Sequence, residues 1–451
     1  MSGAGRAQKR AAPPIEYSLL LTATLCLLAF GAVMVFSASS ARSLLSGGGN
    51  GFYYLERTLV FGAIGLAVMR IASVRGIAAV RVMTPLILVS SLFLLLVVLL
   101  PGVGTQVNGA QRWVGGGFLR FQPSELAKIA LVLYGAYLLS AEPKRARTLA
   151  GLGPYLLIVG ASMLLIAKEP DLGTAIIAAV SVCCMLFVAG VRPRTLAPVA
   201  IVIAVIGLGM IATHPYQEAR LTGFLHPSSD TSGGGFQAKQ ATIAVGSGGL
   251  TGVGLGESVQ KASYLPEAHT DMVAAVIGEE LGLVGMFVLI GLFGMFGYAG
   301  LRAAHRARDR FSKLLAAGLT SLIMAQAALN LFAVLGLAPL TGVPLPFVSY
   351  GGTSLVLTLA AAGLILNVAR RPTARASRRS GAGRGRRSAE GPARLRVVKG
   401  GTRDARALRA KRGATRITRK RAASNGTSRD SGRRHGGARR AGDRRRRRAS
   451  R

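Results

Sequence analysis

Long apolar runs follow one another along most of the chain, and short polar stretches separate them. A helix needs about 20 apolar residues to cross the hydrocarbon core of a membrane. The pattern therefore predicts an all-α, polytopic membrane protein with about ten transmembrane helices. The predicted spans are 17–37, 55–72, 82–100, 123–140, 153–168, 172–190, 196–213, 272–299, 314–337 and 353–369.

Positively charged residues gather in alternate connections between these spans. Cytoplasmic loops of membrane proteins carry an excess of Lys and Arg, so the alternation predicts that both termini are cytoplasmic. The outer connections are then 101–122, 214–271 and 338–352. The first span ends in FSASSARS, which resembles a signal-peptide cleavage site, but the unbroken series of spans behind it favours a membrane helix. The charged connections contain Arg70, Arg75 and Arg81; Lys144, Arg145 and Arg147; Arg192 and Arg194; and Arg302, Arg306, Arg308, Arg310 and Lys313.

The end of the chain differs from the rest in composition. Residues 370–451 contain 31 Lys and Arg against 4 Asp and Glu, which is +27 of the total net charge of +38. Arg, Gly, Ser and Ala cannot build a core, so we expect a disordered cytoplasmic tail behind a membrane domain at 17–369 and a short leader at 1–16. The tail could lie on anionic lipids or dock to an acidic protein. Nucleic-acid binding is less favoured because the tail has no aromatic residues for stacking.

The sequence lacks the signatures of several other classes. Cys26, Cys183 and Cys184 all fall within predicted spans and form no disulfide or metal-binding pattern. No Walker-type or dinucleotide-binding fingerprint is present. The candidate chemistry therefore rests on ionisable residues near the membrane, which face a protein interior or a wet cavity far more often than lipid.

Two clusters of such residues lie on the first part of the predicted outer side. In NGAQRWVGGGFLRFQPSELAK (108–128), Glu125 and Lys128 share one helical face, so they could form a self-satisfied ion pair. Alternatively, Lys128 and Arg112 could meet an anionic ligand. In KEPDLGTA (168–175), the charged residues could be solvated turn residues or could line the mouth of a cavity.

Two further clusters lie in long or broken outer segments. The connection 214–271 is too long for an ordinary loop, and FQAKQATIAVGSGG within it predicts a helix, so we expect an ordered lid. Its glycines would permit close backbone approach to a ligand. In APLTGVPLPFVSYGGTSL (338–355), prolines and glycines break the chain at membrane depth, which requires burial against protein or water. Ser349, Tyr350 and Thr353 would supply hydrogen bonds there.

The stretch SYLPEAHTDMVAAVIGEELG (263–282) carries the densest acidic cluster. Thr270 could cap the following helix, with Asp271 in its first turn. At least one of Glu279 and Glu280 should point into the bundle and pair with Lys or Arg from another span. A carboxylate at this position, near Arg112, Lys128 and Lys261, would suit proton abstraction beside a phosphate leaving group.

Five blocks in this order resemble the SEDS family of shape, elongation, division and sporulation proteins. They are RW…FQPSELAK, EPDLGTA, GSGGLTGVGLG…QK, YLPEAHTDMVAAVIGEELGLVG and TGVPLPFVSYGGTS, which together span about 105–355. YLPEAHTD most resembles the division branch of the family. The resemblance implies a ten-span fold and a peptidoglycan glycosyltransferase that polymerises lipid II. It also implies that Asp271 is the family's essential aspartate.

We expect the mechanism to be inverting glycosyl transfer, with Asp271 as the general base. The resemblance does not assign the cations; from the residues themselves we infer that Arg112, Lys128 and Lys261 neutralise the undecaprenyl pyrophosphate leaving group. A divalent cation, Mg²⁺ or Mn²⁺, could assist them. The other predicted substrate-binding residues are Glu125, Glu267, His269 and Ser349.

The resemblance further implies a class B penicillin-binding protein, the septal transpeptidase, as the partner, and a place in the plasma membrane at the division septum with other division proteins. The basic tail suggests a cytoplasmic division partner such as the tubulin-like FtsZ. Two rival functions remain open. A lipid II flippase should need charges through the full depth of the bundle, whereas a scaffold that recruits the transpeptidase would not need Asp271.

Overall fold

The computed structural model describes residues 13–45, 51–107, 110–117, 120–213, 215–226, 234–263, 265 and 268–370. Most of the predicted leader, and all of the predicted tail beyond Arg370, lie outside these residues. The tail's predicted disorder and its predicted partners therefore stay predictions.

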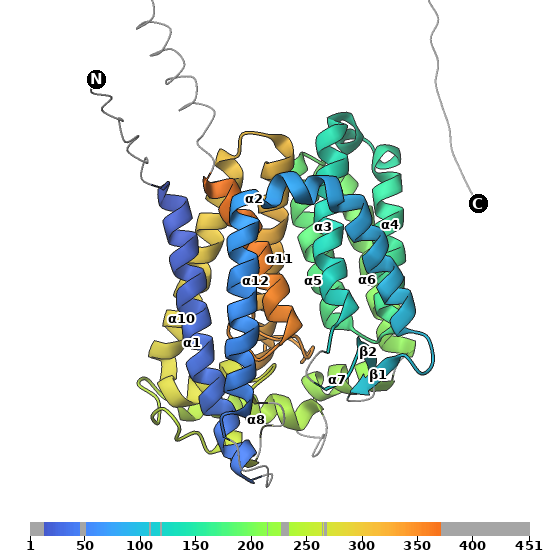
Figure 1. Cartoon of the computed structure of the whole chain (residues 1–451). Helices are drawn as coiled ribbons and strands as arrows, with labels where there is room; N and C mark the ends of the chain where they lie inside the picture. Colours follow the sequence, from blue (N-terminus) through green and yellow to red (C-terminus); the bar gives the residue numbers. More distant parts are fainter. Residues whose placement is uncertain are drawn as a thin grey trace, which may run out of the picture. The chain divides into compact units, whose positions relative to one another are not determined.

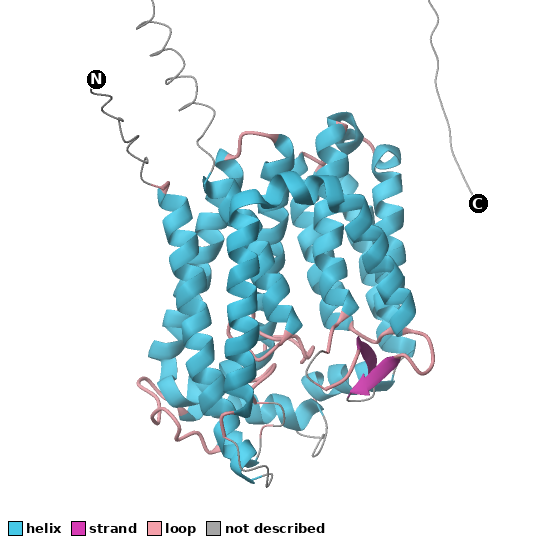
Figure 2. Ribbon diagram, viewed as in Figure 1, coloured by secondary structure: helices cyan, strands magenta, loops and turns pink. Residues whose placement is uncertain are grey.

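Helices make up most of the described structure, as the apolar pattern predicts (Figure 2). Two short strands, β1 (Gly104–Val107) and β2 (Ala110–Val114), pair in antiparallel register. A short 3-10 helix covers Pro143–Arg147. The α-helices are α1 (Ile15–Leu45), α2 (Tyr53–Val98), α3 (Pro123–Ala141), α4 (Leu149–Lys168), α5 (Leu172–Ala189), α6 (Pro193–Thr213), α7 (Pro215–Leu225), α8 (Gly234–Ser247), α9 (Gln260–Ser263), α10 (Val273–Arg306), α11 (Arg310–Val334) and α12 (Thr353–Arg370).

The predicted second and third spans form one continuous helix. At about 1.5 Å per residue, the 46 residues of α2 would extend about 69 Å, far more than one crossing needs. Figure 1 shows α2 running beside α1, bending at the end of the bundle and returning beside α3 and α4. Nine helices of the described chain are long and apolar enough to cross a membrane, and α2 accounts for two crossings. The predicted ten crossings agree with α1 beginning and α12 ending at the same end of the bundle (Figure 1).

Small residues allow the helices to pack closely. The first half of α2 packs along α12, where a side chain at Gly65 would collide with Leu359 and one at Gly363 would collide with the main chain of Met69. Close backbone approach at small residues is the usual way in which membrane helices associate. By contrast, large apolar side chains of α6, including Ile201, Val205 and Leu208, stay exposed, as expected for a surface that faces lipid.

The chain between α11 and α12 is irregular, yet it lies within the bundle. Leu340, Val343, Leu345 and Phe347 are buried, although this segment forms neither helix nor strand. Irregular backbone at membrane depth is tolerated only where protein or water satisfies its polar groups. We call 338–352 the re-entrant segment.

The predicted outer lid is ordered in its described parts, and α7, α8 and α9 lie within it. Two of its glycines, Gly248 and Gly252, approach α10 closely. The predicted approach of the lid glycines to a ligand stays a prediction. A side chain at Gly248 or Gly252 would collide with the main chain of α10. The helix is broken at Gly282, which has φ 62° and ψ −158°. There the main chain of Val253 donates to Glu279 O at 3.0 Å, so lid and helix share backbone hydrogen bonds.

Candidate active site

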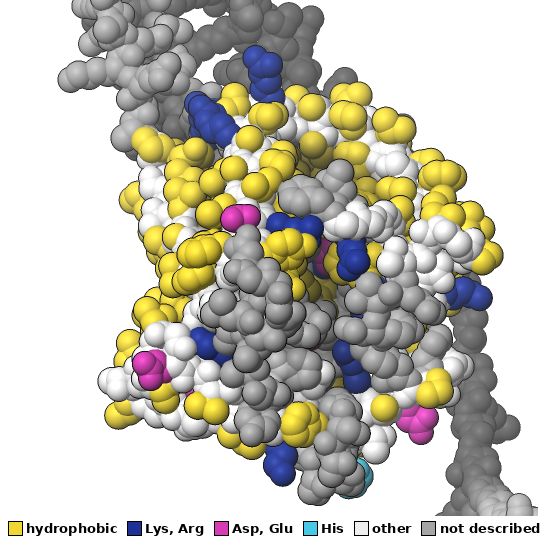
Figure 3. Space-filling model, turned by 60° about the horizontal axis from the view of Figure 1, so that its bottom comes forward, with side chains coloured by type: hydrophobic (Ala, Val, Ile, Leu, Met, Phe, Trp, Pro, Cys, Tyr) yellow, Lys and Arg dark blue, Asp and Glu magenta, His cyan; other side chains and the backbone are white. Residues whose placement is uncertain are grey.

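A cavity of about 480 Å³ opens at the end of the bundle that carries the hairpin and the lid. Its wall combines the start of α2, the hairpin and its connection to α3, the starts of α3 and α5, α7, the turn before α10, and the re-entrant segment. Figure 3 shows this end, where Lys and Arg side chains surround a hollow. The structure thus gathers at one place segments that are far apart in the sequence.

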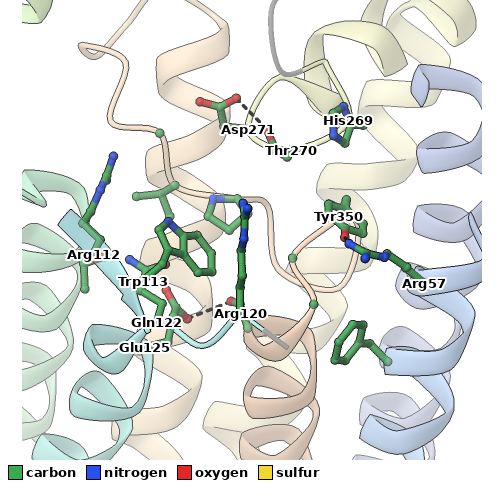
Figure 4. Close-up of a pocket in the computed structure, with 18 of the residues that line it drawn as sticks. Arg57, Arg112, Trp113, Arg120, Gln122, Glu125, His269, Thr270, Asp271 and Tyr350 are labelled. Atoms are coloured by element: carbon green, nitrogen blue, oxygen red, sulfur yellow. Dashed lines mark hydrogen bonds between the residues drawn. The ribbon is translucent and has the colours of Figure 1, made fainter. Parts of the chain in front are cut away.

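Asp271 lies in the wall of this cavity, on the turn before α10. The Thr270 hydroxyl donates to Asp271 Oδ1 at 3.3 Å (Figure 4), and the Asn330 side chain donates to the Asp271 carbonyl at 2.8 Å. Met272, not Thr270, occupies the N-cap of α10, so the predicted capping role of Thr270 is wrong. Asp271 therefore precedes the helix, and its half-buried side chain borders the cavity.

Four arginines line the same cavity, from four different parts of the chain: Arg57, Arg112, Arg120 and Arg220. Arg57 donates to the Tyr350 hydroxyl at 3.4 Å, and its guanidinium lies 4.5 Å from the centre of the Tyr53 ring (Figure 4 shows Arg57 with Tyr350). Arginine binds phosphate oxygens through several N–H donors in a fixed plane. This set is therefore suited to a pyrophosphate.

Arg220 and Asp271 meet at Gly342. A Cβ atom added to Gly342 would lie 3.3 Å from Arg220 Nη1 and 3.7 Å from Asp271 Oδ2. Gly342 has φ 69°, a conformation that other residues rarely adopt. Arg220 also donates to the Leu340 carbonyl at 3.0 Å. The glycine therefore keeps space open between an arginine and the carboxylate.

The turn between α4 and α5 forms an acidic part of the wall. Asp171 caps α5 by accepting from Thr174 N at 3.1 Å, and it also accepts from Gln122 at 2.8 Å. Its carboxylate lies 3.9 Å from Arg112, and it is 2 % exposed. Of the two interpretations of this turn, the structure supports the cavity wall for Asp171, which orients Arg112 within it.

Glu169 lies in the same turn but is fully buried, and neither carboxylate oxygen has a hydrogen-bond partner. Burial, and then the negative charge of Asp171, raise the pKa of Glu169 to about 9, against a smaller opposite effect of Arg112. Glu169 therefore carries a proton at neutral pH.

Glu125 and Lys128 form the buried ion pair that their spacing predicts, with Nζ and Oε1 2.7 Å apart. Ser354 donates to the second oxygen of Glu125 at 2.9 Å, and Lys128 donates to Gln326 at 3.0 Å. Glu125 lines the cavity, whereas Lys128 is 1 % exposed and does not. The placement supports the ion-pair interpretation and does not bring the Lys128 ammonium to an anion site.

Lys261 is also outside the cavity. Its ammonium group lies 2.6 Å from Glu280 Oε1 and 3.1 Å from Ser37 Oγ, and both charged side chains are almost fully buried. Glu279 accepts instead from Ser258 and from the main chain at Val259. Glu280 thus pairs with a lysine as expected, but that lysine comes from the lid rather than from another span.

The other predicted substrate-binding residues have different positions. His269 lines the cavity, and its ring centre lies 4.2 Å from that of Tyr54. The Ser349 hydroxyl accepts from Leu345 N at 2.9 Å and does not line the cavity, so it stabilises the re-entrant segment. Glu267 lies outside the described residues.

Sequence reasoning did not single out Arg57, Arg120 or Arg220 as site residues. Arg57 stands at the start of an apolar span, where a charge is itself a signal of function. Arg120 lies inside one of the family-like blocks. Arg220 gives no such signal, because only the folded lid brings α7 to the cavity.

The described part of the chain contains no group of three or more His, Cys, Asp or Glu residues that could hold a metal ion. In the cavity wall, Asp171 and Glu125 are already held by Arg112 and Lys128. The described residues therefore do not fit a site built from protein ligands alone. Assistance by Mg²⁺ or Mn²⁺ stays a prediction.

Two proteins that are similar to this chain match it over most of its length. The probable peptidoglycan glycosyltransferase FtsW of Geobacter sulfurreducens is 39 % identical over 354 residues, covering 78 % of this chain and 95 % of that protein. Stage V sporulation protein E of Bacillus subtilis is 40 % identical over 357 residues, covering 78 % of this chain and 96 % of that protein.

Solved structures similar to this chain show the same fold. One comes from work on the structural coordination of polymerization and crosslinking by a peptidoglycan synthase complex, with a TM-score of 0.64, 32 % identity and coverage of 78 % of this chain and 96 % of that one. The Thermus thermophilus rod shape determining protein RodA has a TM-score of 0.56 and 27 % identity, with coverage of 78 % and 95 %.

The model of the cell cycle protein family, which is named for FtsW, RodA and SpoVE, matches residues 17–374. This match covers the whole predicted membrane domain and includes Asp271 and the cavity arginines. The chain is therefore a multi-pass membrane protein that belongs to the cell cycle protein family of FtsW, RodA and SpoVE, the SEDS family that its motifs resemble.

Proposed function

We propose that this protein is a peptidoglycan glycosyltransferase that polymerises lipid II at the outer face of the plasma membrane, with Asp271 as the general base. One observation carries the proposal: a carboxylate and four arginines line one cavity at one end of a membrane bundle. The names of the FtsW relatives and the synthase complex of the structural relative support the same activity.

The chemical step needs one base and one stabilised leaving group. Asp271 takes the proton from the 4-hydroxyl of the acceptor's N-acetylglucosamine. That oxygen then attacks the anomeric carbon of the donor's N-acetylmuramic acid from the face opposite the pyrophosphate. The new carbon–oxygen bond forms as the bond to the pyrophosphate breaks, and undecaprenyl pyrophosphate leaves with the electron pair. The configuration at the anomeric carbon is inverted.

The four cavity arginines stabilise the leaving group. Negative charge grows on the pyrophosphate as the glycosidic bond breaks, and fixed cationic donors are most effective where charge develops in the transition state. Arg112 keeps its predicted role. Arg57, Arg120 and Arg220 take over the role predicted for Lys128 and Lys261, whose ammonium groups are committed to buried glutamates.

The partner and the place in the cell follow from the same proposal. The outer orientation rests on the charge pattern of the loops, and the septal location rests on the FtsW relatives. A class B penicillin-binding protein is the expected partner, because the structural relative belongs to a complex of polymerisation and crosslinking. Binding of the basic tail to FtsZ or to anionic lipids belongs to the proposal as well.

The test is polymerisation of labelled lipid II by the purified protein with its cognate transpeptidase. Wild type is compared with Asp271→Asn and with Asp309→Asn, a matched change at the N-cap of α11. We expect glycan strands from wild type and Asp309→Asn but none from Asp271→Asn. Strands from Asp271→Asn at the wild-type rate would remove Asp271 from the chemistry. If folded wild type makes none, lipid II translocation in proteoliposomes tests the flippase.

A further inference from the structure

The side of α11 that faces the cavity wall carries two buried amide side chains, Gln326 and Asn330. They lie four residues apart on one helical face, and each is 3 % exposed. An uncharged amide costs less to bury in a membrane bundle than a charged group does, and its cost falls as its hydrogen bonds are made. The Asn330 oxygen has no hydrogen-bond partner among the described residues, so this side chain is held by its nitrogen alone. Their hydrogen bonds therefore show what they hold together.

Asn330 connects two segments of the cavity wall. Its Nδ2 donates to the carbonyl of Asp271 and to the carbonyl of Val343, both at 2.8 Å. Gln326 donates to the next carbonyl along, that of Pro344, at 3.0 Å, and accepts from Lys128. One face of α11 thus fixes the backbone of the re-entrant segment, and Asn330 ties it to the turn that carries Asp271.

The position of Gly342 depends on this tie. Gly342 directly precedes Val343 and lies between Arg220 and the Asp271 carboxylate. The main chain of Tyr350 also donates to the His269 carbonyl at 3.0 Å, so the turn and the re-entrant segment are joined at two points. Of these two links, the Asn330 side chain makes the one to Asp271 itself, through the Asp271 carbonyl.

We propose that Asn330 is a positioning residue, which fixes the distance of the Asp271 carboxylate from Gly342 and Arg220. The amide suits this role because a single nitrogen donates two hydrogen bonds without carrying a charge. A carboxylate of the same size would face both carbonyls with acceptors only. The inference rests on the proposed function, since it assigns to Asn330 the alignment of the base.

The test compares Asn330→Asp with a matched variant, Asn367→Asp. Asn367 is also 3 % exposed, and its amide donates to the Ala72 carbonyl at 3.0 Å, between α12 and α2 and away from the cavity. Both variants remove a buried amide donor. We expect both to lose thermal stability, but only Asn330→Asp to lower kcat, by about 10- to 100-fold, as misalignment of reacting groups does. KM for lipid II should stay within about 3-fold, since the binding arginines are intact.

Two outcomes would overturn the positioning role. In the first, Asn330→Asp folds and polymerises at the wild-type rate. In the second, its loss of kcat equals that of Asn367→Asp at the same loss of stability. If Asn330→Asp does not fold, Asn330→Ser provides the measurement, because one hydroxyl proton can keep at most one of the two donations and adds no charge. It should also lower kcat, and an unchanged kcat would count against the proposal. Inactive wild type would instead indicate that the proposed function has failed.

Discussion

Asp271 and Glu280 lie close together in the sequence, at the same end of α10, but their surroundings differ. The Asp271 side chain is half-buried and borders a cavity with four arginines. Glu280 is 1 % exposed and is enclosed by Lys261 and Ser37. The first carboxylate has room for a ligand beside it, and the second already has its full set of partners.

The difference shows how two similar membrane-boundary charges can be told apart. A sealed ion pair stabilises a defined packing arrangement only while both partners are present. A charge beside an open cavity can change partner when a ligand binds. The enclosed set comprises Lys261, Glu279 and Glu280, and it joins the lid to α10. The cavity set comprises Asp271 and the arginines, to which we assign the chemistry.

The largest expected effect is a loss of stability when the enclosed set loses its lysine. Lys261→Met leaves the Glu280 carboxylate buried without its cation, which should cost about 3–5 kcal/mol of stability. Thermal unfolding in detergent measures this cost, and adding Glu280→Leu should restore much of the loss. If Lys261→Met is as stable as wild type but does not polymerise, Lys261 belongs to the chemistry after all.

Arg120→Gln should lower activity and leave stability almost unchanged, the opposite of Lys261→Met. The Arg120 side chain is exposed and lines the cavity, while its carbonyl accepts from Thr353 in either variant. We expect kcat/KM for lipid II to fall about 100-fold, as on loss of one transition-state donor. The melting temperature should barely change. Arg194→Gln, on the exposed start of α6, is the matched control. Equal activity of the two variants would exclude Arg120 from the anion site.

Gly342→Ala should have a smaller effect on both properties. A residue with a side chain costs about 1–2 kcal/mol in this backbone conformation, and its Cβ would press on Arg220. Gly190→Ala carries the same type of backbone strain in open space at the end of α5. Both should lose stability, and only Gly342→Ala should lose polymerisation. The same loss of activity in both would indicate strain alone.

Glu169→Gln should have the smallest effect on polymerisation, because Glu169 does not line the cavity, and its effect on stability should depend on pH. The folded protein keeps a proton on Glu169 up to a pKa of about 9, whereas the unfolded chain releases it near 4.5. Stability should therefore fall as pH rises between these values. Glu169→Gln should remove this dependence, so the variant should gain stability relative to wild type as the pH rises from 5 to 8. Melting curves at pH 5 and pH 8 measure the effect, and parallel curves for both proteins would contradict it.

The sequence was sufficient for the spans and for naming Asp271 as a candidate, which the fold places in the cavity wall, because each depends on local pattern or motif. The apolar runs predict every crossing, although the joined α2 was missed. Arg75, Gly76 and Arg81 interrupt the apolar pattern there, but charge and glycine alone do not end a helix.

The rest of the site depends on contacts between distant segments. Lys128 and Lys261 are plausible anion ligands in the sequence, and only the fold shows that Glu125 and Glu280 occupy them. Arg220 reaches the cavity because α7 docks there, with Gln217 donating to the Pro170 carbonyl at 2.5 Å. The close packing of the lid glycines Gly248 and Gly252 likewise depends on where α10 breaks.

The continuous α2 makes the turn between the second and third crossings intolerant of changes in length. No loop separates the two crossings of α2, so one residue inserted after the bend would rotate the rest of the helix by about 100°. That half would then present a different side to α3, and the hairpin with Arg112 would be carried around with it. An ordinary loop would absorb such an insertion. Here the spacing of residues at one end of the bundle sets the orientation of a binding wall at the other.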